Sequence, residues 1–221
     1  MWCDDNFGYI RHFPTAEERQ RSGGNAIYYH VSYYGKPHDY LWLGTSSPAQ
    51  LQQQMNLAYD RGIQHEWILN VGDIKPNEYL TELFLDMAWN IDSVRRQGVR
   101  GHMQQFLQRE FGAKSAAQLT DIMAEYYRLA YERKPEFMGG TRVLEWPVDD
   151  WETIKGLGWS EKHLRERMAK YDDLSNQVEA MFKKVPADKK DEFYQIVKYQ
   201  VQGAAQLNRK LIMACLLYTS P

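Results

Sequence analysis

The fold is decided by residues 25–43, which read Asn-Ala-Ile-Tyr-Tyr-His-Val-Ser-Tyr-Tyr-Gly-Lys-Pro-His-Asp-Tyr-Leu-Trp-Leu. Residues 26–34 are rich in β-branched and aromatic side chains, so they predict a strand that Gly35 and Pro37 end. Side chains alternate along a strand, which puts Tyr28, His30 and Ser32 on one face and Tyr29, Val31 and Tyr33 on the other. One face can therefore meet a polar ligand while the other packs against the protein.

Strand and helix signals continue after this stretch. Ser47, Pro48 and Gln50 predict the start of a helix that runs to Arg61, with Gly62 as its left-handed cap. Residues 65–71 then form a short, mostly apolar run, which predicts a strand buried on both faces. A strand, a helix and a strand at this spacing predict a parallel β-α-β unit.

The chain beyond Pro76 has a helical period. We expect helices from near residue 76 to 92, from a capping box at Ser115, over 160–184 and over 186–213. Residues 134–159 interrupt this pattern with prolines, glycines and three tryptophans, and they predict a long loop. The predicted fold class is therefore α/β followed by all-α, with an α/β domain over 1–92 and a helical bundle over 93–214.

Composition excludes several classes of protein. The 221 residues are 43% hydrophobic, and their net charge of -2 has no basic stripe, so neither nucleic acid nor an anionic membrane is an expected partner. No apolar run approaches the roughly 20 residues of a membrane span. Cys3 and Cys215 suggest no disulfide framework or zinc spacing. The aromatic content of 14% suits sugar binding and a core of large side chains equally well.

The candidate site residues lie at the ends of the predicted strands. They are Asp4, Asp5, Asn6, Tyr28, His30 and Asp73. Ligands bind beyond the carboxyl ends of strands in barrels and open α/β sheets, although aspartates and asparagines there also make ordinary turns, and Asp73 can equally cap the next helix. His30 and His38 have no third ligand at useful spacing, so we predict no metal site.

Four motifs together resemble glycoside hydrolase family 115, the xylan α-glucuronidases. They are Trp2-Cys-Asp-Asp-Asn-Phe-Gly-Tyr-Ile-Arg11, Tyr28-Tyr-His-Val-Ser-Tyr-Tyr-Gly35, Pro37-His-Asp-Tyr40 and Asn70-Val-Gly-Asp-Ile-Lys-Pro76. The resemblance is specific over residues 1–92 and weaker in the helices. It implies that 1–92 are the C-terminal part of a catalytic (β/α)₈ barrel, followed by a helical bundle.

The resemblance also implies the activity. Family members remove α-1,2-linked glucuronic acid, or its 4-O-methyl form, from xylan with inversion and without a cofactor. Asn6, Tyr28 and His30 match family positions that line the pocket around the glucuronic acid. Asp4, Asp5 and Asp73 are further candidates for substrate binding, and Asp4 and Asp5 receive no chemical role. The expected partners are glucuronoxylan and its oligosaccharides, and the parent enzyme is expected to be periplasmic or secreted. Its oligomeric state stays open between a monomer and a homodimer.

Both ends of the sequence suggest a fragment. The family's proposed general acid, a glutamate, precedes the Trp2 motif and therefore Met1, so we expect this chain to be inactive by itself. Residues 215–221 resemble the translated end of a transposon used to prepare sequencing libraries, which predicts an artefact there. The alternative function is a carbohydrate-binding or scaffold protein without catalysis, in which aromatic loops such as 146–159 grip a polysaccharide.

Overall fold

The computed structural model describes residues 1–35, 39–138, 141–142, 154–155 and 158–219 of the chain. His38 and most of the tryptophan-rich loop predicted over 134–159 lie outside these described residues. The described elements are, in order, β1 (Trp2–Cys3), η1 (Glu18–Gln20), β2 (Ala26–His30), α1 (Pro48–Asp60), β3 (Glu66–Asn70), α2 (Glu78–Phe111), α3 (Ala113–Glu132), η2 (Pro135–Phe137), β4 (Thr141–Arg142), β5 (Ile154–Lys155), α4 (Glu161–Phe182), η3 (Ala187–Lys189), α5 (Lys190–Phe193), η4 (Tyr194–Lys198) and α6 (Tyr199–Thr219).

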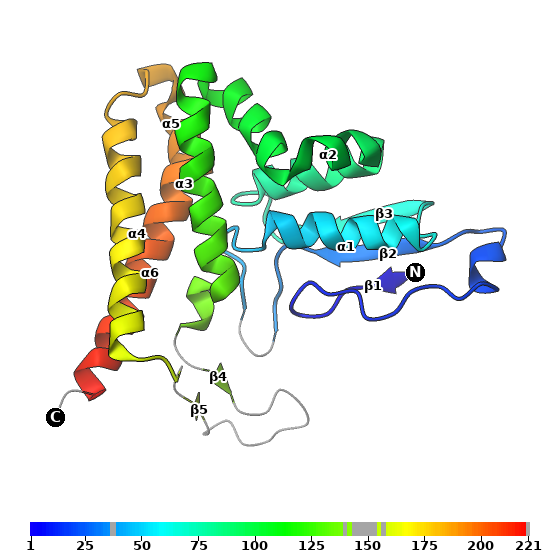
Figure 1. The fold of residues 1–221 in the computed structure, drawn as a ribbon, viewed down its shortest axis with the longest axis horizontal. Helices are drawn as coiled ribbons and strands as arrows, with labels where there is room; N and C mark the ends of the chain where they lie inside the picture. The colour runs from blue at the N-terminus through cyan, green and yellow to red at the C-terminus, as the bar shows by residue number, and fades with distance from the viewer. Residues whose placement is uncertain (36–38, 139–140, 143–153, 156–157, 220–221) are drawn as a thin grey trace. The chain divides into compact units, whose positions relative to one another are not determined.

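A three-stranded parallel sheet carries the candidate site residues. Its strand order is β1-β2-β3, and the three strands lie side by side in Figure 1. Cys3 is opposite Tyr28, and His30 is opposite Asn70. The parallel β-α-β unit predicted around α1 is therefore confirmed, and it aligns the carboxyl ends of all three strands at one edge.

The caps predicted for α1 are also confirmed. The Ser47 hydroxyl accepts a hydrogen bond from the Gln50 amide, Pro48 opens the helix, and Gly62 follows its end with φ of +90°. A residue with a Cβ would be strained at that φ, which explains why the helix ends at a glycine.

Two strand predictions need correction. β2 ends at His30, whereas the sequence pattern extended it to Tyr34, so the predicted alternation of faces does not apply to Tyr33. β3 was predicted to be buried on both faces, but Glu66 is exposed and the other four residues are half-buried. β3 is the outer strand of this sheet, so within the described residues only one neighbouring strand covers it.

The helix α2 continues well past the predicted end near residue 92. It contains two non-helical residues, Asn90 (φ −153°, ψ 86°) and Gly98 (φ 70°, ψ 162°), which divide it into three segments. The Asn90 side chain accepts a hydrogen bond from the Ser93 amide and so caps the second segment. The predicted break at residues 89–92 thus exists, but as a bend inside a longer helical element.

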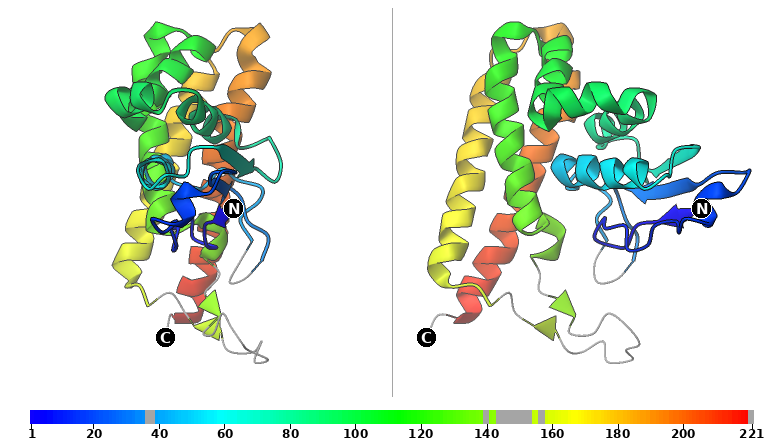
Figure 2. Two further views of the ribbon diagram at one scale, coloured as in Figure 1. Left: turned by 90° about the vertical axis from the view of Figure 1, so that its right-hand side faces the viewer. Right: turned by 45° about the vertical axis from the view of Figure 1, so that its right-hand side comes forward.

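The C-terminal half is helical, as predicted. Figure 2 shows α4 and α6 running alongside each other, and the Ser160 hydroxyl caps α4 by accepting the His163 amide. α3 begins two residues before the expected capping box, because Gly112, with φ of +80°, lets the chain turn directly into it. The helix faces predicted to pack are largely buried, and the buried residues include Leu119, Ile122, Met123, Tyr126 and Ala130 of α3 and Phe193, Val197, Val201 and Ala204 further on. Ile196, predicted on the same face as Phe193, is half-buried, and Ala88, predicted on the packed face of α2, is exposed.

The chain divides into two compact units. The first comprises residues 1–33 and 46–120, and the second comprises 34–45 and 121–221. The domain boundary predicted near residue 92 falls within α2 and stays a prediction. Over the described part of the chain, no helix combines the length and apolarity needed to cross a membrane.

Candidate functional site at the strand ends

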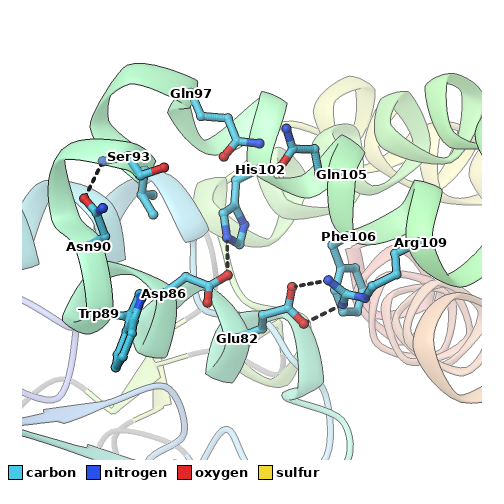
Figure 3. Close-up of a pocket in the computed structure, with 11 residues that line it drawn as sticks. Glu82, Asp86, Trp89, Asn90, Ser93, Gln97, His102, Gln105, Phe106 and Arg109 are labelled. Carbon is cyan, nitrogen blue, oxygen red and sulfur yellow. Dashed lines mark hydrogen bonds and ion pairs between the residues drawn. The ribbon is translucent and has the colours of Figure 1, made fainter.

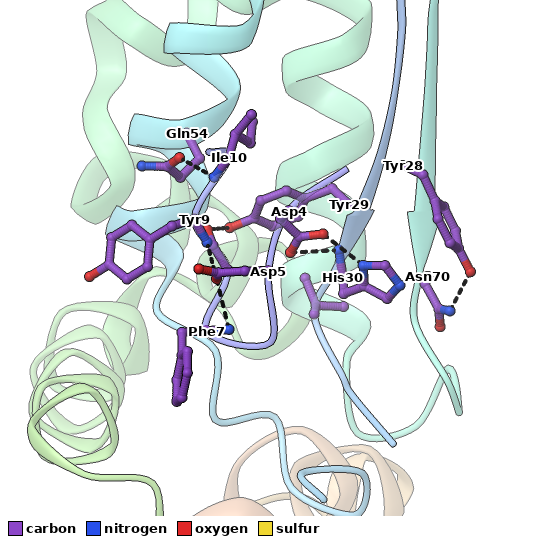
Figure 4. Close-up of polar contacts among 12 residues, drawn as sticks. Asp4, Asp5, Phe7, Tyr9, Ile10, Tyr28, Tyr29, His30, Gln54 and Asn70 are labelled. Atoms are coloured by element: carbon purple, nitrogen blue, oxygen red, sulfur yellow. Dashed lines mark hydrogen bonds and ion pairs between the residues drawn. The ribbon is translucent and has the colours of Figure 1, made fainter. Parts of the chain in front are cut away.

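The centre of the site is a hydrogen-bonded pair, Asp4 and His30. Asp4 directly follows β1, and His30 is the last residue of β2, so the parallel register brings them together across 26 residues. Asp4 Oδ1 lies 2.7 Å from His30 Nδ1, and Asp4 Oδ2 accepts the backbone amide of His30 at 3.3 Å (Figure 4). An ionised carboxylate only accepts hydrogen bonds, so it holds the imidazole with the proton on Nδ1.

Burial gives this pair its electrostatic character. The Asp4 side chain is fully buried, while that of His30 keeps 14% of its surface exposed. Burial raises the pKa of Asp4 above its ordinary value, although the hydrogen bond and charge of His30 act in the opposite direction. A buried carboxylate beside a partly exposed imidazole therefore fixes the ring and directs its remaining nitrogen, Nε2, away from the carboxylate.

Aromatic rings flank His30. The Tyr28 ring lies 4.5 Å from the His30 ring and the Tyr33 ring 5.5 Å from it, both edge to face. The Asn70 amide donates to the Tyr28 hydroxyl, which ties the end of β3 to the same group (Figure 4). The sequence reasoning did not select Asn70 or Tyr33. The position of Asn70 at the end of β3 could have indicated a site residue. Tyr33 could not be found in this way, because the sequence pattern placed it inside β2 on the face opposite His30.

Asp5 shapes the turn that carries Asn6. Its Oδ1 accepts the amides of Phe7 and Tyr9, each at 2.9 Å, and its Oδ2 lies 2.6 Å from the Arg11 guanidinium. Asn6 is half-buried within this turn. The Asp5 carboxylate is thus engaged with its own loop, which is the turn-forming role that the sequence left open beside a binding role.

Side chains of β2 and α1 hold the backbone of the same turn. The Tyr29 hydroxyl donates to the Gly8 carbonyl, and Gln50 donates to the backbone of the turn. The Gln54 side chain accepts the buried amide of Ile10 at 2.9 Å. Gly8 has φ of +81° and a Cβ there would lie 3.1 Å from the Tyr29 hydroxyl, so a glycine is required. No sequence signal linked Gln50 or Gln54 to this turn, because their partners in the turn lie more than forty residues away.

Asp73 lies three residues beyond β3 and is exposed. The N-cap of α2 is Asn77, whose amide donates to the Asp73 backbone carbonyl, so the capping role considered for Asp73 is wrong. A binding role for Asp73 stays a prediction.

A second group of ionisable side chains lies on α2. Ligand atoms of Glu82, Asp86 and His102 lie within 4.8 Å of one another, which is close enough for one metal ion. The Arg109 guanidinium already holds both oxygens of Glu82, at 2.9 and 2.6 Å, and His102 Nε2 lies 3.0 Å from Asp86. The side chains of this cluster already pair with one another, so the strand-end group is the better candidate for a binding or catalytic site.

Comparisons with known proteins identify the family of the chain. The sequence model of Glycosyl hydrolase family 115 matches residues 1–137. Among solved structures, this chain is similar to a family 115 4-O-methyl-α-glucuronidase described as having specificity for decorated arabinogalactans, with 56% sequence identity and a TM-score of 0.91. The similarity covers 97% of this chain and 28% of that one. A search of curated proteins found no match.

Proposed function

Because this chain belongs to glycosyl hydrolase family 115, we propose that it forms part of the active site of an α-glucuronidase. The parallel sheet, in this proposal, is the C-terminal part of a (β/α)₈ barrel whose other strands complete the pocket. The chain spans 28% of the length of the similar structure, which is consistent with one part of a larger enzyme.

The proposed substrate is a plant polysaccharide that carries α-linked glucuronic acid or its 4-O-methyl form. Xylan, with its α-1,2-linked glucuronic acid, is the substrate class that the motifs imply, and arabinogalactan is the one named for the similar structure. Both present a uronic acid at the end of a side branch. An enzyme that acts on such polymers works in the periplasm or outside the cell, which we propose for the parent enzyme.

The observation that carries the proposal is the Asp4–His30 pair. When protonated, His30 keeps its Nδ1–H bond to Asp4 and offers Nε2–H to an anion. A charge-assisted bond to the uronate carboxylate is stronger than one between neutral groups, and the adjacent Asp4 stabilises the cationic ring. The rings of Tyr28 and Tyr33 would then flank the sugar, and Asn6 would contact it from the neighbouring turn.

We propose that this chain binds the sugar without hydrolysing its bond. Inverting hydrolysis needs a carboxylic acid and a carboxylate base on opposite sides of the bond. Asp4 is engaged with His30 and Asp5 with its own turn. The family resemblance puts the general acid in a segment before the Trp2 motif. Release of 4-O-methylglucuronic acid from glucuronoxylan by the purified 221-residue chain would disprove this part of the proposal.

A chimera tests the function itself. The matching segment of the 56%-identical glucuronidase is replaced by this chain, and uronic acid release is measured from glucuronoxylan and from arabinogalactan. We expect the chimera to remain active on at least one polymer and His30→Ala to lower its kcat/KM by about 100-fold or more. His12→Ala, at an exposed position in the same region, is the matched control and should leave activity unchanged.

A folded chimera without activity would contradict the proposal. If the chain then bound the polysaccharide, the carbohydrate-binding or scaffold alternative would take its place.

A further inference from the structure

The bends in α2 create a cavity away from the strand ends. The first and third segments of the helix run antiparallel, because Glu82 pairs with Arg109 and Asp86 pairs with His102. A cavity of about 360 Å³ lies between them (Figure 3). This volume falls in the range of pockets that hold a small ligand.

The cavity has one exposed aromatic side chain at its rim. Trp89 lines it and is 91% exposed, far more than is usual for a tryptophan. An indole face left in water is a platform on which an apolar ring face can stack. The rest of the lining is mostly polar, and it includes the amide side chains of Asn90, Gln97 and Gln105 (Figure 3).

Two buried polar groups of the lining lack partners. His102 is 5% exposed, its Nε2 is bonded to Asp86, and its Nδ1 has no hydrogen-bond partner within the described chain. The buried Nε2 of Gln97 also lacks one among the described residues. When Asp86 accepts a hydrogen bond from Nε2–H of His102, Nδ1 is left as an acceptor, whereas Gln97 Nε2 is a donor. Ligand hydroxyl groups can donate to the first and accept from the second.

The charges of the cavity indicate a neutral ligand. The carboxylates of Glu82 and Asp86 both line it. The Arg109 guanidinium pairs with Glu82, and His102 Nε2 is bonded to Asp86. A uronate would meet two carboxylates there, and Glu82 would have to give up Arg109 before a cation could bind. A neutral ring with one apolar face and several hydroxyls suits this lining best.

We propose that the α2 cavity binds a neutral pyranose unit from the main chain of a polysaccharide, with Trp89 stacking on its ring. The inference rests on the proposed function for its choice of ligand, but it concerns a site separate from Asp4 and His30. Such a site would hold the polymer while the uronic acid branch is processed elsewhere.

The test is a titration of the 221-residue chain with two oligosaccharides that contain no uronic acid, xylohexaose and β-1,3-galactohexaose. Indole NMR signals and calorimetry report binding, and the two sugars distinguish a xylan from a galactan main chain. We expect Trp89→Ala to weaken binding about tenfold. Leu85→Ala is the matched control, because Leu85 is also exposed on α2, one turn earlier, and is not among the cavity residues.

The outcomes separate this proposal from the first one. His30→Ala should leave oligosaccharide binding unchanged while it abolishes the activity of the chimera. Absence of binding to both sugars, or binding that Trp89→Ala does not weaken, would overturn the inference. Zn²⁺ bound by the wild-type chain and lost in His102→Gln, without saccharide binding, would also overturn it and would identify a metal site.

Discussion

A buried carboxylate organises the candidate site at the level of single residues. Burying a charged group is costly unless it is hydrogen-bonded, and Asp4 meets this need with both the ring and the backbone amide of His30. The same two bonds fix the orientation of the imidazole. Stability and function therefore depend on one interaction at this position.

The first prediction concerns the tautomer of His30. In the wild type, the neutral ring should carry its proton on Nδ1, because the Asp4 carboxylate can only accept. In Asp4→Asn, the new amide can donate to Nδ1, so the proton should move to Nε2 and the free energy of unfolding should fall by about 1–3 kcal/mol. Long-range nitrogen-15 NMR of the imidazole and urea unfolding measure the two effects. An Nε2–H tautomer in the wild type would contradict the assignment.

The second prediction concerns Glu136 and pH. Burial raises the pKa of Glu136 to about 7, and burial lowers the pKa of the neighbouring Lys134 to about 8. The folded state thus holds the Glu136 proton more tightly than the unfolded state, in which the pKa of this carboxyl stays near its ordinary value of 4.5. The contribution of this proton to stability is complete below about pH 4.5 and is lost as the pH rises through about 7.

We therefore expect the wild type to lose stability relative to Glu136→Gln between pH 5 and 7.5, as measured by urea unfolding at several pH values. Removal of the Glu136 charge also lowers the pKa of Lys134 further. The stability of Glu136→Gln therefore rises with pH relative to that of the wild type, which enlarges the same difference. Glu166→Gln, at an exposed position of α4, is the control and should give a constant offset. A pH-independent difference for Glu136→Gln would show that the carboxyl group is not perturbed.

At the level of elements, Arg167 joins three helices of the second unit. It extends from α4, donates to the carbonyls of Leu129 and Arg133 near the end of α3, and donates to Asn208 of α6 at 2.8 Å. Burial lowers its pKa below the ordinary value. A guanidinium that satisfies the last carbonyls of a helix also opposes the negative end of the helix dipole.

The third prediction is that Arg167→Met lowers the free energy of unfolding by about 3 kcal/mol or more, because three buried acceptors lose their donor. Arg165→Met, on the same helix but paired with Glu161 at the surface, should cost less than about 1 kcal/mol. Denaturant unfolding of both variants measures the difference. Equal effects would show that the buried contacts of Arg167 contribute no more than a surface pair.

At the level of the whole molecule, residues 34–45 leave the first unit and belong to the second. Three side chains of the second unit hold the backbone of this segment: Gln200 accepts the Gly44 amide at 2.8 Å, Tyr199 donates to the Trp42 carbonyl, and Lys134 donates to the Thr45 carbonyl. These bonds fix the path of the chain immediately after the loop that follows His30.

The fourth prediction is that Gln200→Ala speeds hydrogen exchange of the Gly44 amide by about tenfold or more and costs about 1–3 kcal/mol of stability, because a buried donor loses its acceptor. Gln206→Ala, an exposed position on α6, should leave both unchanged. Exchange measured by NMR and unfolding by urea provide the test. Unchanged exchange of Gly44 in Gln200→Ala would show that this bond does not hold the segment.

The sequence by itself determined the local structure and the family. The caps at Ser47 and Gly62, the alternation along β2 and most of the buried faces of the helices follow from contacts within a few residues, which sequence patterns record. The motifs around Asn6, Tyr28 and His30 were specific enough to identify family 115, and the comparisons confirm that assignment.

Only the tertiary structure decided how those residues are used. The parallel register joins Asp4 to His30 and brings Asn70 to Tyr28, over separations of 26 and 42 residues that no sequence period encodes. In the folded chain, the Asp5 carboxylate accepts hydrogen bonds from its own turn, and Gln54 accepts one from the Ile10 amide of that turn. The physical reason is that hydrogen bonding and burial depend on which surfaces meet, and the pairing of distant segments sets this only once the strands and helices have packed.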